Sequence, residues 1–221
     1  MRRTTYFLLL LFSLACFYCT PLQAQQNQEL KRSKTIFLYP EFQDGKVRQS
    51  FGRYAKAKVN IFLKDASLCF INEEGKILKA YTKGIFGVEF PDSSIYMKVD
   101  SAMAKVIAQK DYNYLLCVTS VNMRRYREET TGGSELPFFE MSDFGIFLQM
   151  DGQQREEDYG LPLQDKYYFS VKGNVIPANE SDFKKVMDPE QKQAFKVLMA
   201  NRFWSWNDPE DLEMLLDFLP K

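Results

Sequence analysis

The alternation of apolar and polar residues between residues 35 and 122 constrains the fold of this chain more than any other feature. Successive side chains of a β-strand point to opposite faces, so a period of two marks a strand with one face in the core. The clearest example is a strand predicted at residues 54–64, whose core face carries Ala57, Val59, Ile61 and Leu63. Its other face carries Lys58, Asn60, Phe62 and Lys64, where Phe62 is the apolar exception. We expect Phe62 either to contact a second layer, formed by the C-terminal helices, or to mark a ligand-binding face.

Turn signals divide this region into short strands. Asp44-Gly45 is a dipeptide typical of hairpins, and it predicts a turn between strands at 35–42 and 46–51. Residues 102–110 fit a short helix as well as a strand, and we favour the strand. Further turns are predicted at Asp65-Ala66, Asn72 to Gly75 and Gly173-Asn174, and further strands at 68–71, 77–81, 85–90, 95–99, 114–121 and 166–171. Together these signals predict an antiparallel β-meander.

The C-terminal residues 179–221 have helical patterns. Asp188-Pro189 and Asp208-Pro209 each place an N-cap aspartate before a proline at the first helical position. Apolar stripes follow both starts, with Ala194, Phe195, Leu198 and Met199 in the first helix and Leu212, Leu215, Leu216 and Leu219 in the second. We interpret Trp204 and Trp206, between the helices, as packing anchors, with sugar stacking as the alternative. The predicted fold class is therefore α+β: a β-meander sheet, open or barrel-like, followed by two to three C-terminal helices that pack on it.

The first 24 residues match a secretory signal peptide. Arg2 and Arg3 precede an uncharged apolar run from Tyr6 to Tyr18, which is too short to span a bilayer. Cleavage between Ala24 and Gln25 is expected, followed by a disordered stretch at 25–34, a β-sheet domain at 35–178 and the helical segment. The alternative is a lipoprotein signal, in which Cys16 carries the lipid. We expect a periplasmic or extracellular protein without a transmembrane segment in its mature chain.

Residues 123–165 are polar and contain several glycines and prolines, so a long loop is predicted there. Long loops on rigid sheets often carry recognition, which makes this loop the expected contact region. Within it, Pro137, Phe138 and Phe139 form an aromatic knot that either packs back onto the sheet or contacts a partner.

Two cysteines, Cys69 and Cys117, follow the expected cleavage site. In an exported protein they could form a disulfide, and the alternative is two small buried thiols.

The sequence lacks most catalytic chemistry. It has no histidine, which excludes histidine general bases and the commonest metal ligand. The 29 basic and 29 acidic residues balance, and no basic block is present, so nucleic-acid binding is not expected. Neither a catalytic residue, a metal ligand nor a cofactor-binding residue is predicted. The remaining catalytic option is a carboxylate pair, for which the adjacent acids are Glu73-Glu74, Glu128-Glu129 and Glu156-Glu157-Asp158.

Two segments resemble a family of small exported β-rich proteins from Bacteroidetes bacteria, a domain of unknown function. The first is YPEFQDGKVRQSFGRYAKAKVNIFLKDASLCFINEEGK, where the matching positions are Phe42, Gly45, Val47, Gly52, Asn60, Leu68 and Phe70. The second is the C-terminal segment that begins KYYFSVKGN and ends in a leucine-rich helix. The resemblance implies export and this fold, but no functional residue.

These observations predict an exported, non-catalytic binding or scaffold module of the bacterial cell envelope. Its partner would be an envelope protein or a surface glycan. The alternative is a carboxylate-dependent hydrolase that acts on glycans or cell-wall polymer.

Overall fold

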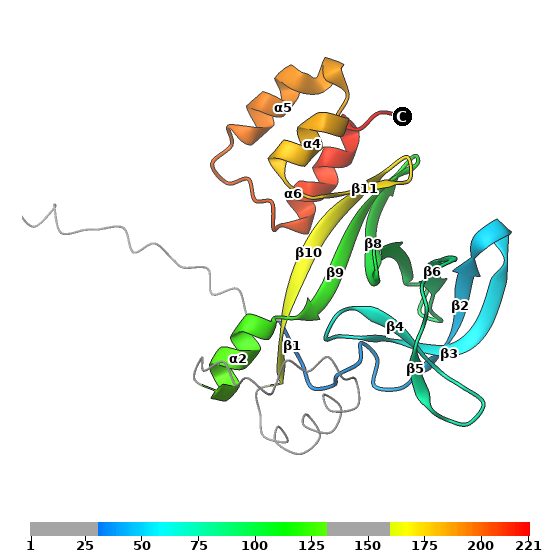
Figure 1. The fold of residues 1–221 in the computed structure, drawn as a ribbon. Helices are drawn as coiled ribbons and strands as arrows, with labels where there is room; N and C mark the ends of the chain where they lie inside the picture. Colours follow the sequence, from blue (N-terminus) through cyan, green and yellow to red (C-terminus); the bar gives the residue numbers. More distant parts are fainter. Residues whose placement is uncertain (1–30, 132–159) are drawn as a thin grey trace, which may run out of the picture. The chain divides into compact units, whose positions relative to one another are not determined.

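The dominant element of the fold is an antiparallel sheet, which has eleven strands among the described residues and does not close on itself (Figure 1). The structure is a computed structural model that describes residues 31–131 and 160–221. The strands are β1 (Arg32–Ser33), β2 (Gln43–Gln49), β3 (Tyr54–Phe62), β4 (Ser67–Ile71), β5 (Ile77–Lys79), β6 (Ile85–Glu89), β7 (Ile95–Val99), β8 (Ala102–Lys110), β9 (Asn113–Val121), β10 (Leu161–Val171) and β11 (Asn174–Pro177). The helices are η1 (Ser50–Gly52), α2 (Met123–Thr131), α4 (Glu180–Val186), η2 (Pro189–Gln191), α5 (Lys192–Met199), α6 (Pro209–Met214) and η3 (Leu215–Phe218). The α+β class is confirmed.

The sheet consists of two meanders that are joined edge to edge. Strands β2 to β5 form one and β6 to β11 form the other, and β2 joins them because it pairs with both β3 and β6. The sheet also bends until the β3–β4 turn reaches the second meander. There, Met103 N–H donates to Ala66 C=O at 2.8 Å and Val121 N–H donates to Leu63 C=O at 2.7 Å. Residues 102–110 form a strand, as we favoured.

The hairpin predicted at Asp44-Gly45 is wrong, because both residues lie inside β2. The turn comes after β2, at η1. Gly45 serves close packing instead of a turn, since a Cβ added there would lie 2.4 Å from Val59 Cγ2 and 3.2 Å from Val88 Cγ2. A glycine in a strand often marks such a close approach. The Asp-Gly dipeptide alone does not distinguish a glycine in a turn from a glycine that permits close packing.

The segment before β2 differs from the prediction in two ways. Residues 31–34 are not disordered, because β1 pairs with β10 in the register Arg32 to Pro162 and Ser33 to Leu161. Residues 35–42 are a series of bends instead of a strand, with one isolated bridge between Phe37 and Phe62. This segment crosses β3 and packs against it with partly buried side chains, so its apolar residues reflect packing and not a strand period.

Phe62 is fully buried, and the segment 31–42 covers it. Its ring lies 5.7 Å from that of Phe37, which in turn contacts Phe42 at 5.0 Å. The expectation that the C-terminal helices or a ligand would contact Phe62 is therefore wrong. The N-terminal segment takes that place because the bend of the sheet brings β3 beneath it.

The C-terminal helices cover the far ends of β9 and β10. Their predicted starts are confirmed, since the side chains of Asp188 and Asp208 accept hydrogen bonds from Glu190 N–H and Glu210 N–H. The second apolar stripe is buried throughout; in the first, Phe195 is buried and Ala194 is exposed. The helices pack on a cluster that includes Leu115, Phe169, Val171, Phe183, Phe195, Leu212, Leu215, Leu216 and Leu219, with Trp204 and Trp206 packed against it. Among the described residues, no helix is long and apolar enough to cross a membrane.

The predicted loop at 123–165 is wrong at both of its ends. Residues 123–131 form α2, and β10 begins at Leu161, five residues before the strand predicted there. The residues just after Gly173 form β11, which lies inside the β-sheet domain expected at 35–178. Residues 132–159 lie outside the described part of the chain. They include Pro137, Phe138 and Phe139, which were predicted as a partner contact.

Candidate functional site

A pocket lies on the sheet between two layers that cover β9 and β10. At one end of these strands, Leu115 and Phe169 lie under the C-terminal helices. At the other end, Val121 and Leu163 lie under the N-terminal segment and α2. Between these covered pairs, on the same face, the register places Thr119 opposite Asp165 and Cys117 opposite Tyr167. These two pairs line the pocket, and each layer contacts one of them: Lys31 bonds Asp165, and Tyr167 packs against the cluster under the C-terminal helices.

The pocket encloses about 260 Å³. It is built by segments that are far apart in the sequence, from the start of the described chain to the first residue of α6. The lining residues are Lys31, Leu38, Ile61, Leu63, Tyr96, Met103, Lys105, Ile107, Cys117, Thr119, Asp165, Tyr167 and Pro209. Concave, largely apolar sites with a few convergent polar groups are the usual form of a small-molecule site.

One wall of the pocket is a hydrogen-bonded polar cluster. Lys31 Nζ donates to both carboxylate oxygens of Asp165, at 3.1 and 3.0 Å, and the Thr119 hydroxyl donates to Oδ1 at 2.5 Å. Cys117 Sγ lies 3.8 Å from the Thr119 hydroxyl oxygen. The cluster exists because β1 pairs with the beginning of β10, which brings Lys31 beside Asp165, 134 positions later.

The floor of the pocket is formed by a row of side chains on four neighbouring strands, β7 to β10. Tyr96 on β7 faces Lys105 on β8, Lys105 faces Cys117 on β9, and Cys117 faces Tyr167 on β10. Directly opposed residues on antiparallel strands present their side chains on the same face, about 5 Å apart. The row therefore places Lys105 between Tyr96 and Cys117, with Tyr167 on the next strand. Lys105 is exposed and forms no ion pair within 4.0 Å among the described residues.

Burial raises the pKa of the cysteine and the two tyrosines in this row. It raises the pKa of the Cys117 thiol to about 11, with Asp165 adding to the effect, and it raises the pKa of Tyr167 to about 12. The pKa of Tyr96 is raised as well, mainly by burial. Because the thiolate is the nucleophilic form of cysteine, a protonated Cys117 does not act as a nucleophile near neutral pH. The pocket offers hydrogen-bond donors and acceptors, one ion pair and one further ammonium group.

This arrangement does not support hydrolysis by two carboxylates. That mechanism requires a second acid about 5–10 Å from the first, and Asp165 is the sole acid among the described residues that line the pocket. The adjacent acids of the sequence are engaged elsewhere: Glu74 with Lys76, Glu128 with Arg124, and Glu129 with both Arg125 and Arg32. Arg32, aided by Arg125, lowers the pKa of Glu129. Glu156, Glu157 and Asp158 lie outside the described residues. In the described ranges, no cluster of three metal-ligating side chains is present.

The two cysteines lie in different places, each as a free thiol. Cys69 is buried in β4 opposite Asn60 and Lys79, whereas Cys117 faces the pocket from β9. Cys69 and Cys117 are therefore two buried thiols, which was the alternative to a disulfide, and no bond joins them. Ala24, Gln25 and Cys16 lie outside the described residues.

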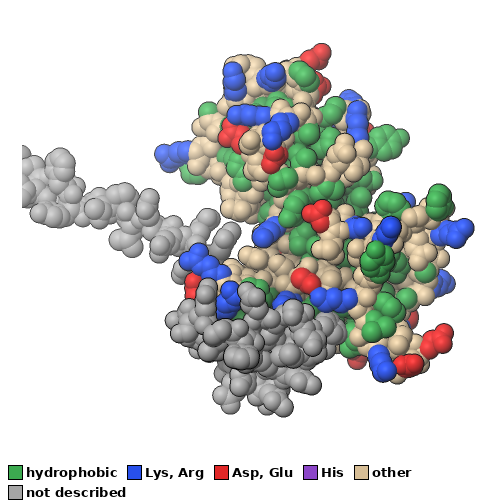
Figure 2. Space-filling view, in the orientation of Figure 1, with side chains coloured by type: hydrophobic (Ala, Val, Ile, Leu, Met, Phe, Trp, Pro, Cys, Tyr) green, Lys and Arg blue, Asp and Glu red, His purple; other side chains and the backbone are tan. Residues whose placement is uncertain are grey.

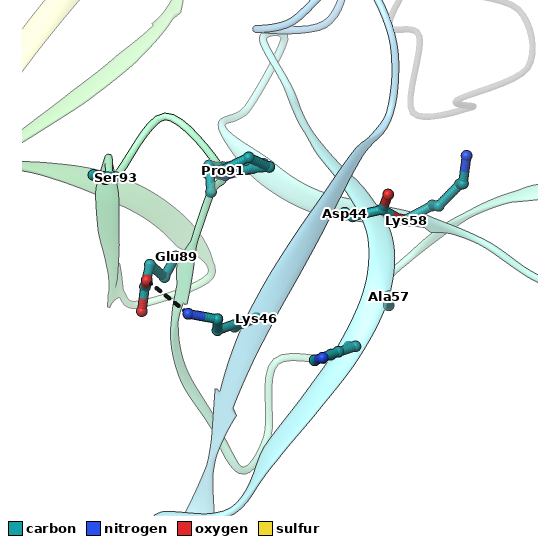
Figure 3. A pocket seen from close by; sticks show the side chains of 9 residues that line it. Asp44, Lys46, Ala57, Lys58, Glu89, Pro91 and Ser93 are labelled. Carbon is teal, nitrogen blue, oxygen red and sulfur yellow. Dashed lines mark hydrogen bonds and ion pairs between the residues drawn. The ribbon is translucent and has the colours of Figure 1, made fainter.

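A second, more open hollow of about 960 Å³ lies over β2, β3 and β6 (Figure 3). Lys46 points toward Glu89 there and pairs with it at 3.1 Å, while Asp44 and Lys58 face each other across the β2–β3 pair. Most side chains that line this hollow are charged and solvated, whereas most of those that line the first pocket are apolar. We therefore take the pocket between the two layers as the candidate functional site.

Sequence reasoning missed most of this site. The alternation in β9 places Cys117 and Thr119 on one face, and that signal was available. Lys31 lay in a stretch expected to be disordered, and Asp165 lay at the end of a predicted loop. Only the pairing of β10 with both β1 and β9 brings these residues together.

No protein-family model matches the chain, and no curated protein or solved structure matches it either.

Proposed function

We propose that this chain is an exported, non-catalytic binding module of the bacterial cell envelope that holds a small amphipathic ligand in the pocket on β7 to β10. The observation that carries the proposal is that one pocket brings polar side chains and apolar side chains together; the polar ones are Lys31, Lys105, Thr119, Asp165 and Tyr167. Lys31, Thr119 and Asp165 are held by the hydrogen bonds between them, so this part of the site is preformed. Preformed sites lose little conformational entropy when a ligand binds.

The charges of the pocket indicate the type of ligand. Lys31 is compensated by Asp165, whereas Lys105 is not paired among the described residues. The pocket therefore carries one formal positive charge in excess, which favours a carboxylate or a similar anionic head group. Leu38, Ile61 and Met103 provide the apolar surface for a short tail. At about 260 Å³, the pocket is smaller than the roughly 300–1,000 Å³ of drug-sized sites, so the ligand is small.

Binding can be measured by isothermal titration calorimetry with phenylacetate and hexanoate as probe anions. Lys105→Glu should weaken binding about tenfold or more, because it replaces the uncompensated ammonium with a carboxylate. The matched control is Lys166→Glu, which makes the same charge change on an exposed residue of β10 that faces the opposite side of the sheet. Equal affinities for the two variants would contradict the proposal, as would the absence of binding to either probe.

Export is supported by the N-terminal sequence and by the resemblance to exported Bacteroidetes proteins. Expression in a Gram-negative host, followed by fractionation and N-terminal sequencing, should yield a periplasmic chain that begins at Gln25. Palmitate labelling that is lost in Cys16→Ala would instead establish the lipoprotein form. Recovery of the whole chain with its first residues in the cytoplasm would contradict export.

A further inference from the structure

The turn between β2 and β3 presents a large aromatic ring directly to solvent. Phe51 lies at the centre of η1 and its side chain is 95% exposed. Its backbone has φ 61° and ψ 29°, in the left-handed region that bulky residues rarely adopt. The chain thus places a phenylalanine where packing gives no benefit and where backbone conformation favours glycine or asparagine. Outliers of this kind often accompany a functional role.

A second loop lies beside this turn. Ser50 N–H donates to Gly84 C=O at 2.9 Å, which fixes the link between β5 and β6 next to η1. Tyr81, in that link, is 80% exposed. The two loops together line a shallow hollow of about 380 Å³, formed by Gln49, Ser50, Phe51, Arg53, Tyr81, Lys83, Gly84 and Ile85. We call this surface the hairpin tip.

The hairpin tip is basic as well as aromatic. Arg53 and Lys83 are exposed, and neither forms an ion pair within 4.0 Å among the described residues. None of the described residues that line the hollow is acidic. The neighbouring exposed positions on the hairpin continue the pattern with Arg48, Tyr54 and Lys56. Figure 2 shows blue basic and green hydrophobic side chains interspersed over this hairpin, at the right of the view.

We propose that the hairpin tip docks on the surface of an anionic phospholipid bilayer. Phe51 and Tyr81 enter the interfacial region, and Arg53 and Lys83 contact the lipid phosphates. Aromatic rings favour the membrane interface, and lysine and arginine beside them are attracted to anionic head groups. A protruding turn suits a bilayer better than a stable protein partner, which needs roughly 800 Å² of surface on each side. This surface is separate from the pocket on β7 to β10.

The test is co-sedimentation of the whole protein with phosphatidylglycerol vesicles and, for comparison, phosphatidylcholine vesicles. The central variant is Phe51→Asn, because asparagine tolerates the left-handed conformation and keeps the turn while removing the ring. We expect a loss of at least tenfold in affinity for phosphatidylglycerol vesicles, together with an unchanged or raised melting temperature. Arg53→Gln/Lys83→Gln should lose a similar amount, and 0.5 M NaCl should weaken wild-type binding.

The matched control is Phe203→Asn, which removes another exposed ring, 76% exposed, that also lies beside an arginine, Arg202. It should bind vesicles as the wild type does, and so should Lys105→Glu in the pocket. The proposal is wrong if wild type does not bind phosphatidylglycerol vesicles, or if Phe51→Asn binds them as well as Phe203→Asn does. It is also wrong if the double charge variant alone loses binding, since the tip would then be a general polyanion surface that also accepts acidic glycans.

Discussion

The side-chain amide of Asn60 pairs with the backbone of Tyr39 as a second strand would. Its Nδ2 donates to Tyr39 C=O at 2.8 Å, and its Oδ1 accepts from Tyr39 N–H at 3.1 Å. The same amide donates to Glu41 C=O at 3.2 Å and accepts from Ile61 N–H at 2.8 Å. Asn60 is fully buried, so these four bonds satisfy its amide completely. They hold the bent segment 35–42 on β3, where a continuous ladder is absent.

Asn60→Ala should therefore lower the free energy of unfolding by about 3 kcal/mol, because it removes four hydrogen bonds and leaves part-buried backbone groups of Tyr39 and Glu41 without these partners. Urea denaturation measures this change. Asn174→Ala, at an exposed position of β11, should cost less than about 0.5 kcal/mol. A loss below 1 kcal/mol for Asn60→Ala would show that the segment is held by its apolar side chains and by its two backbone bonds, from Leu38 N–H to Ile61 C=O and from Leu63 N–H to Ile36 C=O.

Asp165→Ala should lower the free energy of unfolding by about 1–2 kcal/mol. The change removes the acceptor of both Lys31 and the half-buried Thr119 hydroxyl, and each loss contributes modestly. The control is Glu74→Ala, which breaks the exposed Lys76–Glu74 pair at 3.0 Å and should change the stability by less than about 0.5 kcal/mol. Equal effects in urea titrations would mean that the pocket wall contributes no more than a surface ion pair.

Gly87→Ala should destabilise the sheet more than Gly45→Ala. A Cβ at position 87 would lie 2.4 Å from the backbone carbonyl oxygen of Tyr96, which cannot move without breaking the β6–β7 ladder. At position 45 the nearest atom is a methyl group of Val59, also at 2.4 Å, and the side chain can shift in part. We expect about 3 kcal/mol for Gly87→Ala and about 1–2 kcal/mol for Gly45→Ala, measured by thermal and urea unfolding. The reverse order would contradict this packing.

Stability should fall as the pH rises above about 9. Burial raises the pKa of Cys69 to about 12 and that of Cys117 to about 11, whereas thiols in the unfolded chain ionise near pH 8.5. Between these values the unfolded state binds fewer protons than the folded state, so the free energy of unfolding decreases with pH. Urea titrations at pH 7, 8, 9 and 10 should show this decline, and it should be shallower in Cys69→Ala/Cys117→Ala. A decline of the same slope in the double variant would assign the effect to other groups.

Much of the sheet was predictable because short local patterns in the sequence mark its strands and turns. The strand around Val59 and Ile61 and the turn at Asn72 to Gly75 depend only on neighbouring residues, and both are confirmed, although burial does not alternate from Val59 to Phe62. The helix starts at Asp188 and Asp208 were predictable for the same reason, since an N-cap bond spans two or three positions.

The errors arose where a distant partner decides the structure. Gly45 has the local signature of a turn, but it lies in a strand. The side chains of Val59 and Val88 on the adjacent strands occupy the space that a Cβ at position 45 would fill. Residues 35–42 have strand-like composition, yet the side chain of Asn60 replaces the ladder that a strand would need. Phe62 looked exposed on a polar face until the bend of the sheet brought Phe37 onto it.

The sequence by itself determined the class of the fold, most strand and helix positions and the absence of histidine chemistry, because these depend on periods, caps and composition. The tertiary structure alone decided the pocket. Lys31, Lys105 and Asp165 belong to three strand regions, and only strand register and the two covering layers bring them around one pocket. Register is set by packing across the whole sheet, which no short window of residues contains.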